Sequence, residues 1–394
     1  MIAIANNVPI FKYFLYHPDR PITEADSEWC APLPLARPGT VATTSSIRYG
    51  EYFSSIRSFL TADDGGGLLQ ALSVRLNHEI TWADVGGIHI CIQKHGAFYH
   101  PAQVTAFVGA LSVSFVVNVA ISPGGQAGLR QEFDNLNRLN HMFPRRYIPM
   151  AFHQGTGYAG ENHCRIPMFL GEWLGGYHEF HVAAGEDKFQ FIRVWNPEKS
   201  QLWSPEQKTL LYRRASEILT HYYRPETFEQ IFPWHHGAGD FIVRFKNDDL
   251  DLRLITVRGY VPLIDADGTD PMAVLEAMLR FFLHLSLRMR IDRVDGTGDL
   301  VWLDETAVKG AISGFFDGLA QKSRINVFAE SLVTAAAFYF SRLTLADLAE
   351  ALEGIINAYP LRSPERRLMA SHLTTHADVL FAQLRQHLAL VCCL

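Results

Sequence analysis

The stretch that decides the fold is PWHHGAGDFIVRFKNDDLDLRLITVRGY, residues 233–260. It begins as a loop rich in titratable side chains. The apolar residues 241–243 then predict a short strand, residues 246–251 a polar turn, and the alternating residues 252–257 a returning strand. Two histidines and an aspartate just before a buried strand are typical of an active-site frame, because the strand is rigid and the loop presents the polar groups.

The composition excludes several classes of protein. The chain has 394 residues, of which 48% are hydrophobic, so it can fill the cores of two or three domains. A formal net charge of -6 argues against a primary role on nucleic acid or on an anionic membrane, which would need a basic face. The cysteines are odd in number and irregularly spaced, which predicts a cytoplasmic location: Cys30, Cys91, Cys164, Cys392 and Cys393.

One run raises the question of a membrane span. Residues 104–121 contain no charged side chain over eighteen positions. Gly109 and Ser112 interrupt the run, however, and its β-branched content suits two adjacent strands. We therefore expect strands here and no membrane contact. Residues 1–15 lack the basic start and long apolar core of a signal peptide.

Periodicity predicts three regions. Residues 1–85 form an N-terminal extension with helices at 51–60 and 67–78. Residues 86–176 are rich in strands, at 87–93, 103–110, 114–122, 147–154 and 164–171, with a helix at 129–140. Residues 177–394 begin with a hairpin at 178–195 and are then mostly helical, with a helix after the capping residue Ser204 and others at 271–287, 306–322, 329–359 (broken near Leu343) and 364–390.

This order of elements resembles that of the protein-kinase-like superfamily, and in particular its aminoglycoside and choline phosphotransferase branch. Residues 171–176, GEWLGG, resemble the hinge between the lobes. Residues 233–243 resemble the catalytic loop H-x-D-x-x-x-x-N, and residues 254–260 the strand that ends in D-F-G. The resemblance covers residues 86–320. It implies an α+β, two-lobed fold, with a small antiparallel-sheet N-lobe at 86–176 and a mainly helical C-lobe at 177–394.

The chain departs from the family at the residues that carry the chemistry. The catalytic aspartate falls on His235 and the asparagine on Asp240. The sequence Val257-Arg258-Gly259 stands where the family has D-F-G, so the aspartate that binds magnesium is missing.

The N-lobe departs from the family as well. Ser122 stands where the family has its phosphate-binding lysine, and Glu132 matches the usual glutamate partner of that lysine. Glu172, Trp173 and Leu174 would line the nucleotide hinge.

These losses favour a non-catalytic protein. Phosphoryl transfer in this fold depends on metal ions and on a carboxylate that orients the nucleophile. Loss of one well-placed electrostatic group costs about 3–4 kcal/mol. We therefore expect a ligand-binding or regulatory pseudokinase that holds a small molecule or nucleotide in the inter-lobe cleft. The alternative is an atypical phosphotransferase for a small hydroxyl compound, using ATP and Mg²⁺. His235 or His236 would then be the general base, Asp240 the metal ligand, and Arg258 a phosphate contact.

Structural roles are open for each of these residues taken alone. The two histidines would hydrogen-bond loop carbonyls, and Asp240 would cap a backbone turn. The convergence of three polar groups favours a functional pocket for the cluster as a whole. A third hypothesis treats residues 329–359 as a docking surface, because this segment is apolar enough to pair with another copy in a homo-oligomer.

Other motifs have simpler interpretations. Residues 155–160 spell G-x-G-x-x-G but no helix follows them, so we expect a β-turn. Residues 122–128 open a helix and either hold an anion or mark the helix start. His178 and His181 alternate as in a strand.

Two motifs in the C-terminal half resemble metal sites but have simpler interpretations, and we expect His372 and His376 to be a solvated or packed pair on a helix. His372 and His376 lack an evident third metal ligand. Residues 265–270 resemble a calcium loop only faintly, and Asp270 before Pro271 is typical of a helix start.

Overall fold

The structure is a computed structural model, and it describes residues 9–16, 19–34, 44–96, 98–160, 164–184, 190–194, 203–246, 249–265, 268–296, 298–323 and 327–391. Cys392 and Cys393 therefore lie outside the described residues. The fold is α+β. The chain divides into two compact units, unit 1 comprising Met1–Pro144 and Pro149–Gly175, and unit 2 comprising Arg145–Ile148 and Gly176–Leu394.

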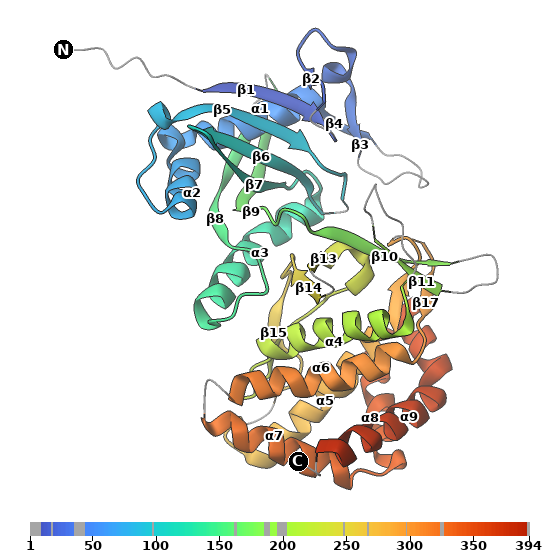
Figure 1. Cartoon of the computed structure of the whole chain (residues 1–394). Helices are drawn as coiled ribbons and strands as arrows, with labels where there is room; N and C mark the ends of the chain where they lie inside the picture. The colour runs from blue at the N-terminus through green and yellow to red at the C-terminus, as the bar shows by residue number, and fades with distance from the viewer. Residues whose placement is uncertain are drawn as a thin grey trace. The chain divides into compact units, whose positions relative to one another are not determined.

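Unit 1 is built on a mixed seven-stranded sheet (Figure 1). Its strand order is β2-β1-β5-β6-β7-β9-β8, and β1 runs parallel to β5 while the other neighbours are antiparallel. The strands are β1 (Ile10–Leu15), β2 (Pro21–Ile22), β5 (Val85–Ile92), β6 (His100–Val108), β7 (Leu111–Val119), β8 (Ala151–Ala159) and β9 (Cys164–Glu172). A separate two-stranded sheet pairs β3 (Pro32–Pro34) with β4 (Thr44–Arg48).

The sequence predicted β5, β6, β7, β8 and β9, although β8 starts four residues later than expected. The uncharged run at 104–121 is confirmed as two strands, because β6 and β7 form an antiparallel hairpin. Sequence reasoning missed β1, which adds a parallel strand beside β5 to what was expected to be a small antiparallel sheet. Its six residues alternate in burial, but only pairing with β5 makes them a strand.

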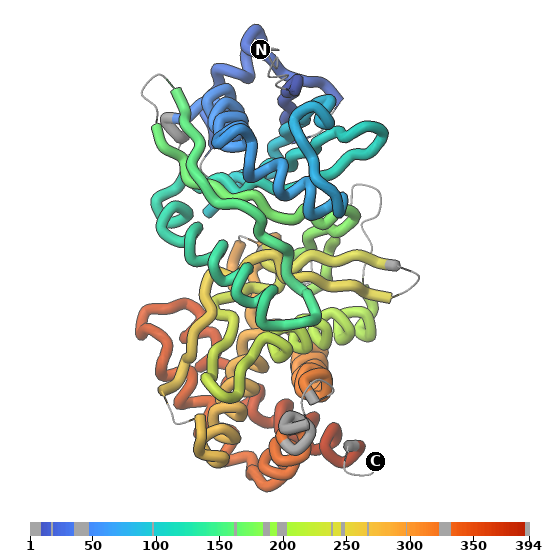
Figure 2. Tube along the Cα trace, turned by 90° about the vertical axis from the view of Figure 1, so that its left-hand side faces the viewer, coloured from blue at the N-terminus to red at the C-terminus, as the bar shows by residue number. Residues whose placement is uncertain are grey.

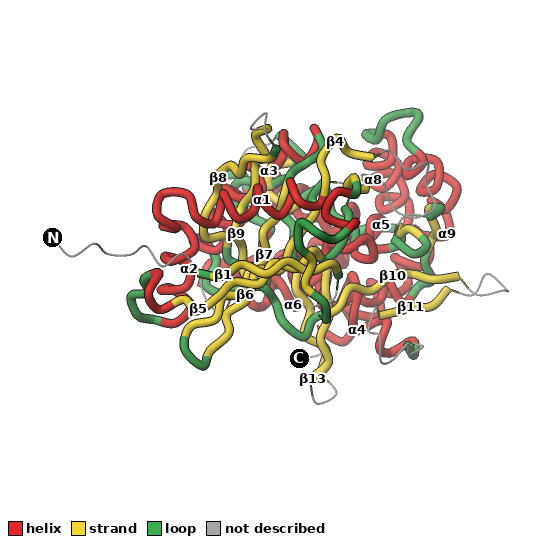
Figure 3. The backbone as a smooth tube through the Cα atoms, turned by 90° about the horizontal axis from the view of Figure 1, so that it is seen from above, coloured by secondary structure: helices red, strands yellow, loops and turns green. Residues whose placement is uncertain are grey.

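Three α-helices belong to unit 1: α1 (Tyr49–Thr61), α2 (Gly66–Leu76) and α3 (Pro123–Met142). Short 3₁₀ turns lie at Ser27–Cys30, Ala62–Gly65 and Trp82–Asp84. Helix α1 lies across the strands (Figure 3), and its apolar face packs into one core with α2 and the sheet. Buried members of this core include Tyr52, Phe53, Ile56 and Leu60 from α1, Leu68 and Leu72 from α2, and Ile88, Val104, Val117, Met168 and Leu170 from the sheet.

Gly155 and Gly157 lie within β8, which ends at Ala159, so the predicted β-turn is wrong for both of them. Gly157 is required by close packing: a Cβ there would lie 2.1 Å from the carbonyl oxygen of Ser55 in α1. Only Gly160 has a left-handed backbone, with φ of 65°, where the strand ends in a turn. The G-x-G-x-x-G spacing therefore serves helix–strand packing.

Unit 2 is mainly helical, with α4 (Pro205–Tyr222), α5 (Pro271–Met289), α6 (Thr306–Ser323), α7 (Val327–Arg342), α8 (Leu345–Asn357) and α9 (Pro364–Val391). These bounds confirm the predicted helices and the predicted break near Leu343. The side chains of Ser204 and Asp270 cap α4 and α5 by accepting from backbone amides, as their positions predicted. Among the described residues no single helix is long and apolar enough to cross a membrane. Only Leu332–Arg342 and Leu345–Asn357 together reach that composition, and they are bent by 107°.

Helices α4 and α6 lie side by side (Figure 1) because α6 presents glycine every fourth residue. A Cβ on Gly310, Gly314 or Gly318 would lie 2.0–2.6 Å from an atom of α4. These positions have the i, i+4 spacing that places residues on one helix face. The two backbones can therefore approach more closely than larger side chains would allow.

The strands of unit 2 form a four-stranded sheet of order β11-β10-β13-β14, and Figure 2 shows the β13–β14 hairpin in yellow. They are β10 (His178–Ala184), β11 (Gln190–Val194), β13 (Phe241–Lys246) and β14 (Asp249–Leu254). Two smaller sheets pair β12 (Glu229–Ile231) with β15 (Tyr260–Pro262) and β16 (Ile291–Arg293) with β17 (Leu300–Trp302). The returning strand expected at 252–257 ends at Leu254, so Thr256 and Arg258 leave the sheet and turn toward the loop before β13.

Candidate functional site

The loop before β13 closes on itself through one π-helical turn, His236–Asp240. Turns of this kind are rare and occur frequently at functional sites. Gly239 within the turn has a φ of 84°, which a glycine adopts without strain. The turn brings Asp240 back beside the start of the loop, where its carboxylate accepts a hydrogen bond of 2.8 Å from the backbone N–H of His235.

Asp240 is fully engaged with protein donors. The Arg258 guanidinium contacts both carboxylate oxygens, with Nη2–Oδ1 2.6 Å and Nη1–Oδ2 3.0 Å. The hydroxyl of Thr256 donates to Oδ1 at 2.9 Å, and the His235 N–H donates to Oδ2. A carboxylate accepts about four hydrogen bonds, so these donors occupy its capacity. Asp240 is only 1% exposed and is charge-paired with Arg258. The residue predicted as metal ligand therefore joins the loop to the segment after β14.

His236 lies in the interior, away from solvent. Its Nε2–H donates to the carbonyl oxygen of Met289 at 3.1 Å, and its Nδ1 lies 3.0 Å from Oδ2 of Asp292. The second contact is close but is not aligned as a hydrogen bond. Both residues are 0% exposed, and a Cβ on Gly237 would lie 2.0 Å from the Asp292 carboxylate. His236 is thus a packed residue that joins the loop to β16.

His235 is the most accessible of the three predicted catalytic groups. The residue is partly exposed. Burial, followed by the positive charge of Arg288, lowers the pKa of His235 to about 4. The imidazole is therefore neutral at pH 7 and keeps a lone pair. It is a weak base, because the same environment disfavours the protonated ring.

Three further residues at the loop were missed by sequence reasoning. Arg288 of α5 is buried, donates to the carbonyl oxygen of Trp234 at 2.9 Å, and lies over the indole ring. Asp292 of β16 contacts His236. Nδ1–H of His181 in β10 donates a hydrogen bond of 2.5 Å to the carbonyl oxygen of Gly237. No local motif marks Arg288 or Asp292, and His181 was predicted only as a strand residue, since each comes from an element distant in sequence from the loop.

The binding residues predicted in unit 1 have separate local roles. Ser122 caps α3 by accepting from the N–H of Gly125 at 3.2 Å, which supports the helix-start interpretation of residues 122–128. Glu132 is buried in α3 and accepts a 2.7 Å hydrogen bond from the hydroxyl of Tyr99. The structure therefore gives Ser122 and Glu132 different partners.

The predicted hinge residues directly follow β9 or end it. Glu172 pairs with Arg75 of α2, Nη1–Oε1 2.6 Å, and also accepts from the N–H of Met150 at 3.2 Å. Trp173 and Leu174 are partly exposed beyond the strand. Their role in nucleotide binding stays a prediction.

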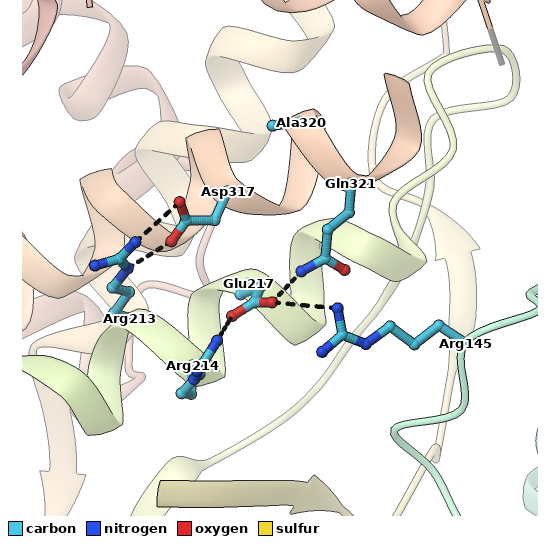
Figure 4. Close-up of a pocket in the computed structure, with 7 residues that line it drawn as sticks. All are labelled: Arg145, Arg213, Arg214, Glu217, Asp317, Ala320 and Gln321. Atoms are coloured by element: carbon cyan, nitrogen blue, oxygen red, sulfur yellow. Dashed lines mark hydrogen bonds and ion pairs between the residues drawn. The ribbon is translucent and has the colours of Figure 1, made fainter. Parts of the chain in front are cut away.

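Unit 2 also contains a charged surface pocket of about 220 Å³ (Figure 4). It is lined by Arg145, Arg213, Arg214, Glu217, Asp317, Ala320 and Gln321. Figure 4 shows the arginines turned toward acidic partners: Arg213 binds Asp317 through two contacts, and Arg214 binds the buried Glu217 at 2.8 Å. The charges in the pocket are thus largely paired within the protein.

The two other histidine pairs, one in β10 and one in α9, make contacts within the protein. His178 and His181 lie in β10, as their alternation predicted. His372 stacks on Trp302, and His376 is buried with its Nε2 3.2 Å from the hydroxyl of Ser286. Within the described ranges, no group of three or more histidine, cysteine, aspartate or glutamate side chains is arranged to hold a metal ion. No protein-family model matches the chain, and no curated protein matches it.

Proposed function

We propose that the chain is a kinase-like protein that binds a ligand without catalysing phosphoryl transfer. Two observations support the kinase-like part. The order of three strands, a helix and two strands is present in unit 1 as β5, β6, β7, α3, β8 and β9. The main segment of unit 2, from Gly176 onward, starts with strands and continues mainly as helices, with the polar loop before the β13–β14 hairpin.

The engagement of Asp240 carries the non-catalytic part of the proposal. A magnesium ion bound by this carboxylate would have to displace Arg258, whose charge already neutralises it at 2.6 Å and 3.0 Å. Breaking a buried ion pair in this way costs about 3–5 kcal/mol. The neighbouring D-F-G position holds Val257, which cannot contribute a ligand. The ordinary two-metal support for the phosphates is therefore lost at both positions.

An atypical phosphotransferase is the second candidate. It is favoured by His235, which is partly exposed, neutral at pH 7 and adjacent to Asp240. In that case His235 would accept the proton of a substrate hydroxyl.

Thermal-shift titration with ATP and GTP, each with and without Mg²⁺, separates the two. A ligand at 100 times its Kd stabilises the fold by about 2.7 kcal/mol. The proposal expects a nucleotide shift that Mg²⁺ does not change and no phosphate released or transferred. A Mg²⁺-dependent shift that Asp240→Asn removes would favour the phosphotransferase. No shift with any nucleotide would exclude nucleotides as the ligand.

A further inference from the structure

Three side chains meet at one edge of the sheet in unit 1. The hydroxyls of Tyr16 and Tyr49 are 2.9 Å apart, and Nε2 of His95 lies 2.7 Å from the first and 3.1 Å from the second. Tyr16 directly follows β1, His95 lies beyond the end of β5, and Tyr49 begins α1. Because β1 and β5 are parallel neighbours, their carboxyl ends lie at the same edge and bring Tyr16 and His95 together.

The backbone conformation of Tyr16 holds its phenol close to His95. Tyr16 has a φ of 59°, a left-handed conformation that costs a non-glycine residue about 1–3 kcal/mol and that clusters at functional sites. Its N–H is held by the carbonyl oxygen of Ile92 at 3.0 Å. The turn directs the phenol back over the end of the sheet toward His95.

A second histidine, His100, is hydrogen-bonded to the other ring nitrogen of His95. Nδ1 of His95 lies 2.8 Å from Nδ1 of His100, so one proton is shared between these two atoms. In the tautomer with the proton on His95 Nδ1, Nε2 presents its lone pair to both phenols. Metal-binding histidines have this arrangement, with the second ring nitrogen donating to a buried partner.

The distances between the two phenol oxygens and Nε2 of His95 can be compared with the donor spacing in two coordination geometries. For bonds of about 2.0–2.1 Å, neighbouring donors are about 2.8–3.0 Å apart around an octahedral ion but about 3.3–3.4 Å apart around a tetrahedral one. The observed separations of 2.7, 2.9 and 3.1 Å are those of hydrogen bonds among the three side chains, and an octahedral ion could take their place without moving the donor atoms far. Tyr16 is 42% exposed, which leaves the outer side of the triangle accessible to solvent.

We propose that Tyr16, Tyr49 and His95 form one face of an octahedral binding site for Fe³⁺, with His100 as the positioning residue behind His95. Two phenolates supply hard, anionic oxygen donors and the imidazole supplies a nitrogen that suits iron. On binding, each phenol releases its proton to solvent, and the ion bonds to the two oxygens and to Nε2. The remaining three positions are left for water or a small chelating ligand. All of these residues belong to unit 1, so the proposed site does not depend on the function of the loop in unit 2.

The test is titration of the full chain with ferric nitrilotriacetate, followed by visible absorption. Phenolate-bound Fe³⁺ gives a charge-transfer band that neither the protein nor the free chelate gives. We expect this band at one iron per chain. Tyr16→Phe and Tyr49→Phe should each weaken it, and the double variant should lose it. The matched control is Tyr158→Phe, an exposed tyrosine on β8 of the same unit, which should leave the band unchanged.

His100→Asn tests the positioning role, with melting curves confirming that each variant is folded. We expect the band to persist with iron affinity reduced by about 10–100-fold. Unchanged affinity would contradict that role. A band that survives in the double tyrosine variant, or no band with the wild-type chain, would overturn the site. Tighter binding of Zn²⁺ than of Fe³⁺ would overturn the octahedral assignment.

Discussion

Replacement of Arg258 by methionine tests the ion pair that closes the candidate loop. Methionine keeps an unbranched apolar stem and removes the guanidinium, so Asp240 retains only the N–H of His235 and the hydroxyl of Thr256. Removing one partner of a buried pair costs about 3–5 kcal/mol, because the other charge is left unpaired. The Asp240 side chain is 2% exposed and that of Arg258 is 26% exposed, so water reaches one side of the pair. We therefore expect a loss of about 3 kcal/mol, at the lower end of that range.

The assay is guanidinium-induced unfolding followed by tryptophan fluorescence, since the buried Trp234 lies in the loop. Arg224→Met is the control: Arg224 in the same unit is 30% exposed and pairs with Glu229 at 3.2 Å, but Glu229 is 13% exposed and so better hydrated than Asp240, and the loss should be about 0–1 kcal/mol. Adding Asp240→Leu to Arg258→Met should restore part of the lost stability, because the unpaired carboxylate is gone. A loss for Arg258→Met no larger than that for Arg224→Met would refute the reasoning.

Three further outcomes follow from packing and burial. Gly157→Ala should cost about 1–3 kcal/mol in urea unfolding, because its Cβ would lie 2.1 Å from a carbonyl oxygen of α1, whereas Gly66→Ala, with open space around it, should not destabilise. Gly314→Ala should cost a similar amount at the α4–α6 contact, while Gly354→Ala in α8 should stabilise by up to about 1 kcal/mol; equal effects would contradict the close approach. Burial lowers the pKa of His284 to about 3, so the unfolded chain binds the proton first as the pH falls below about 6.5. His284→Gln should therefore remove about 2 kcal/mol of the stability difference between pH 7 and pH 5, and an unchanged difference would contradict this.

The elements that the sequence predicted well carry their signals locally. Helices α4 and α5 begin at capping residues, Ser204 and Asp270, and the break between α7 and α8 coincides with a capping box at Thr344. Strands β6 and β7 alternate clearly in burial. Strand β1 was missed because its pairing with β5 bridges a long stretch of chain. A parallel partner so distant leaves no local pattern.

The candidate site was predictable in its residue types but not in its contacts. His235, His236 and Asp240 share one loop because they are close in sequence, but their surroundings differ: His235 is partly exposed, whereas His236 and Asp240 are buried. The partner of Asp240 is Arg258, beyond the whole β13–β14 hairpin, and the partner of His236 is Asp292, beyond α5. Such pairs depend on how the elements pack. A carboxylate that packs against an arginine is paired with it and is less available to a metal ion. The spacing of residues along the sequence does not show which partner is present.

We infer that the Asp240 carboxylate is paired with Arg258 and does not bind a metal ion. The most direct measurement is electron paramagnetic resonance of Mn²⁺ titrated into the protein with ATP, in the wild type and in Asp240→Asn. We expect the same amount of free Mn²⁺ in both titrations. Bound Mn²⁺ in the wild type that Asp240→Asn releases, with the variant still folded, would contradict it.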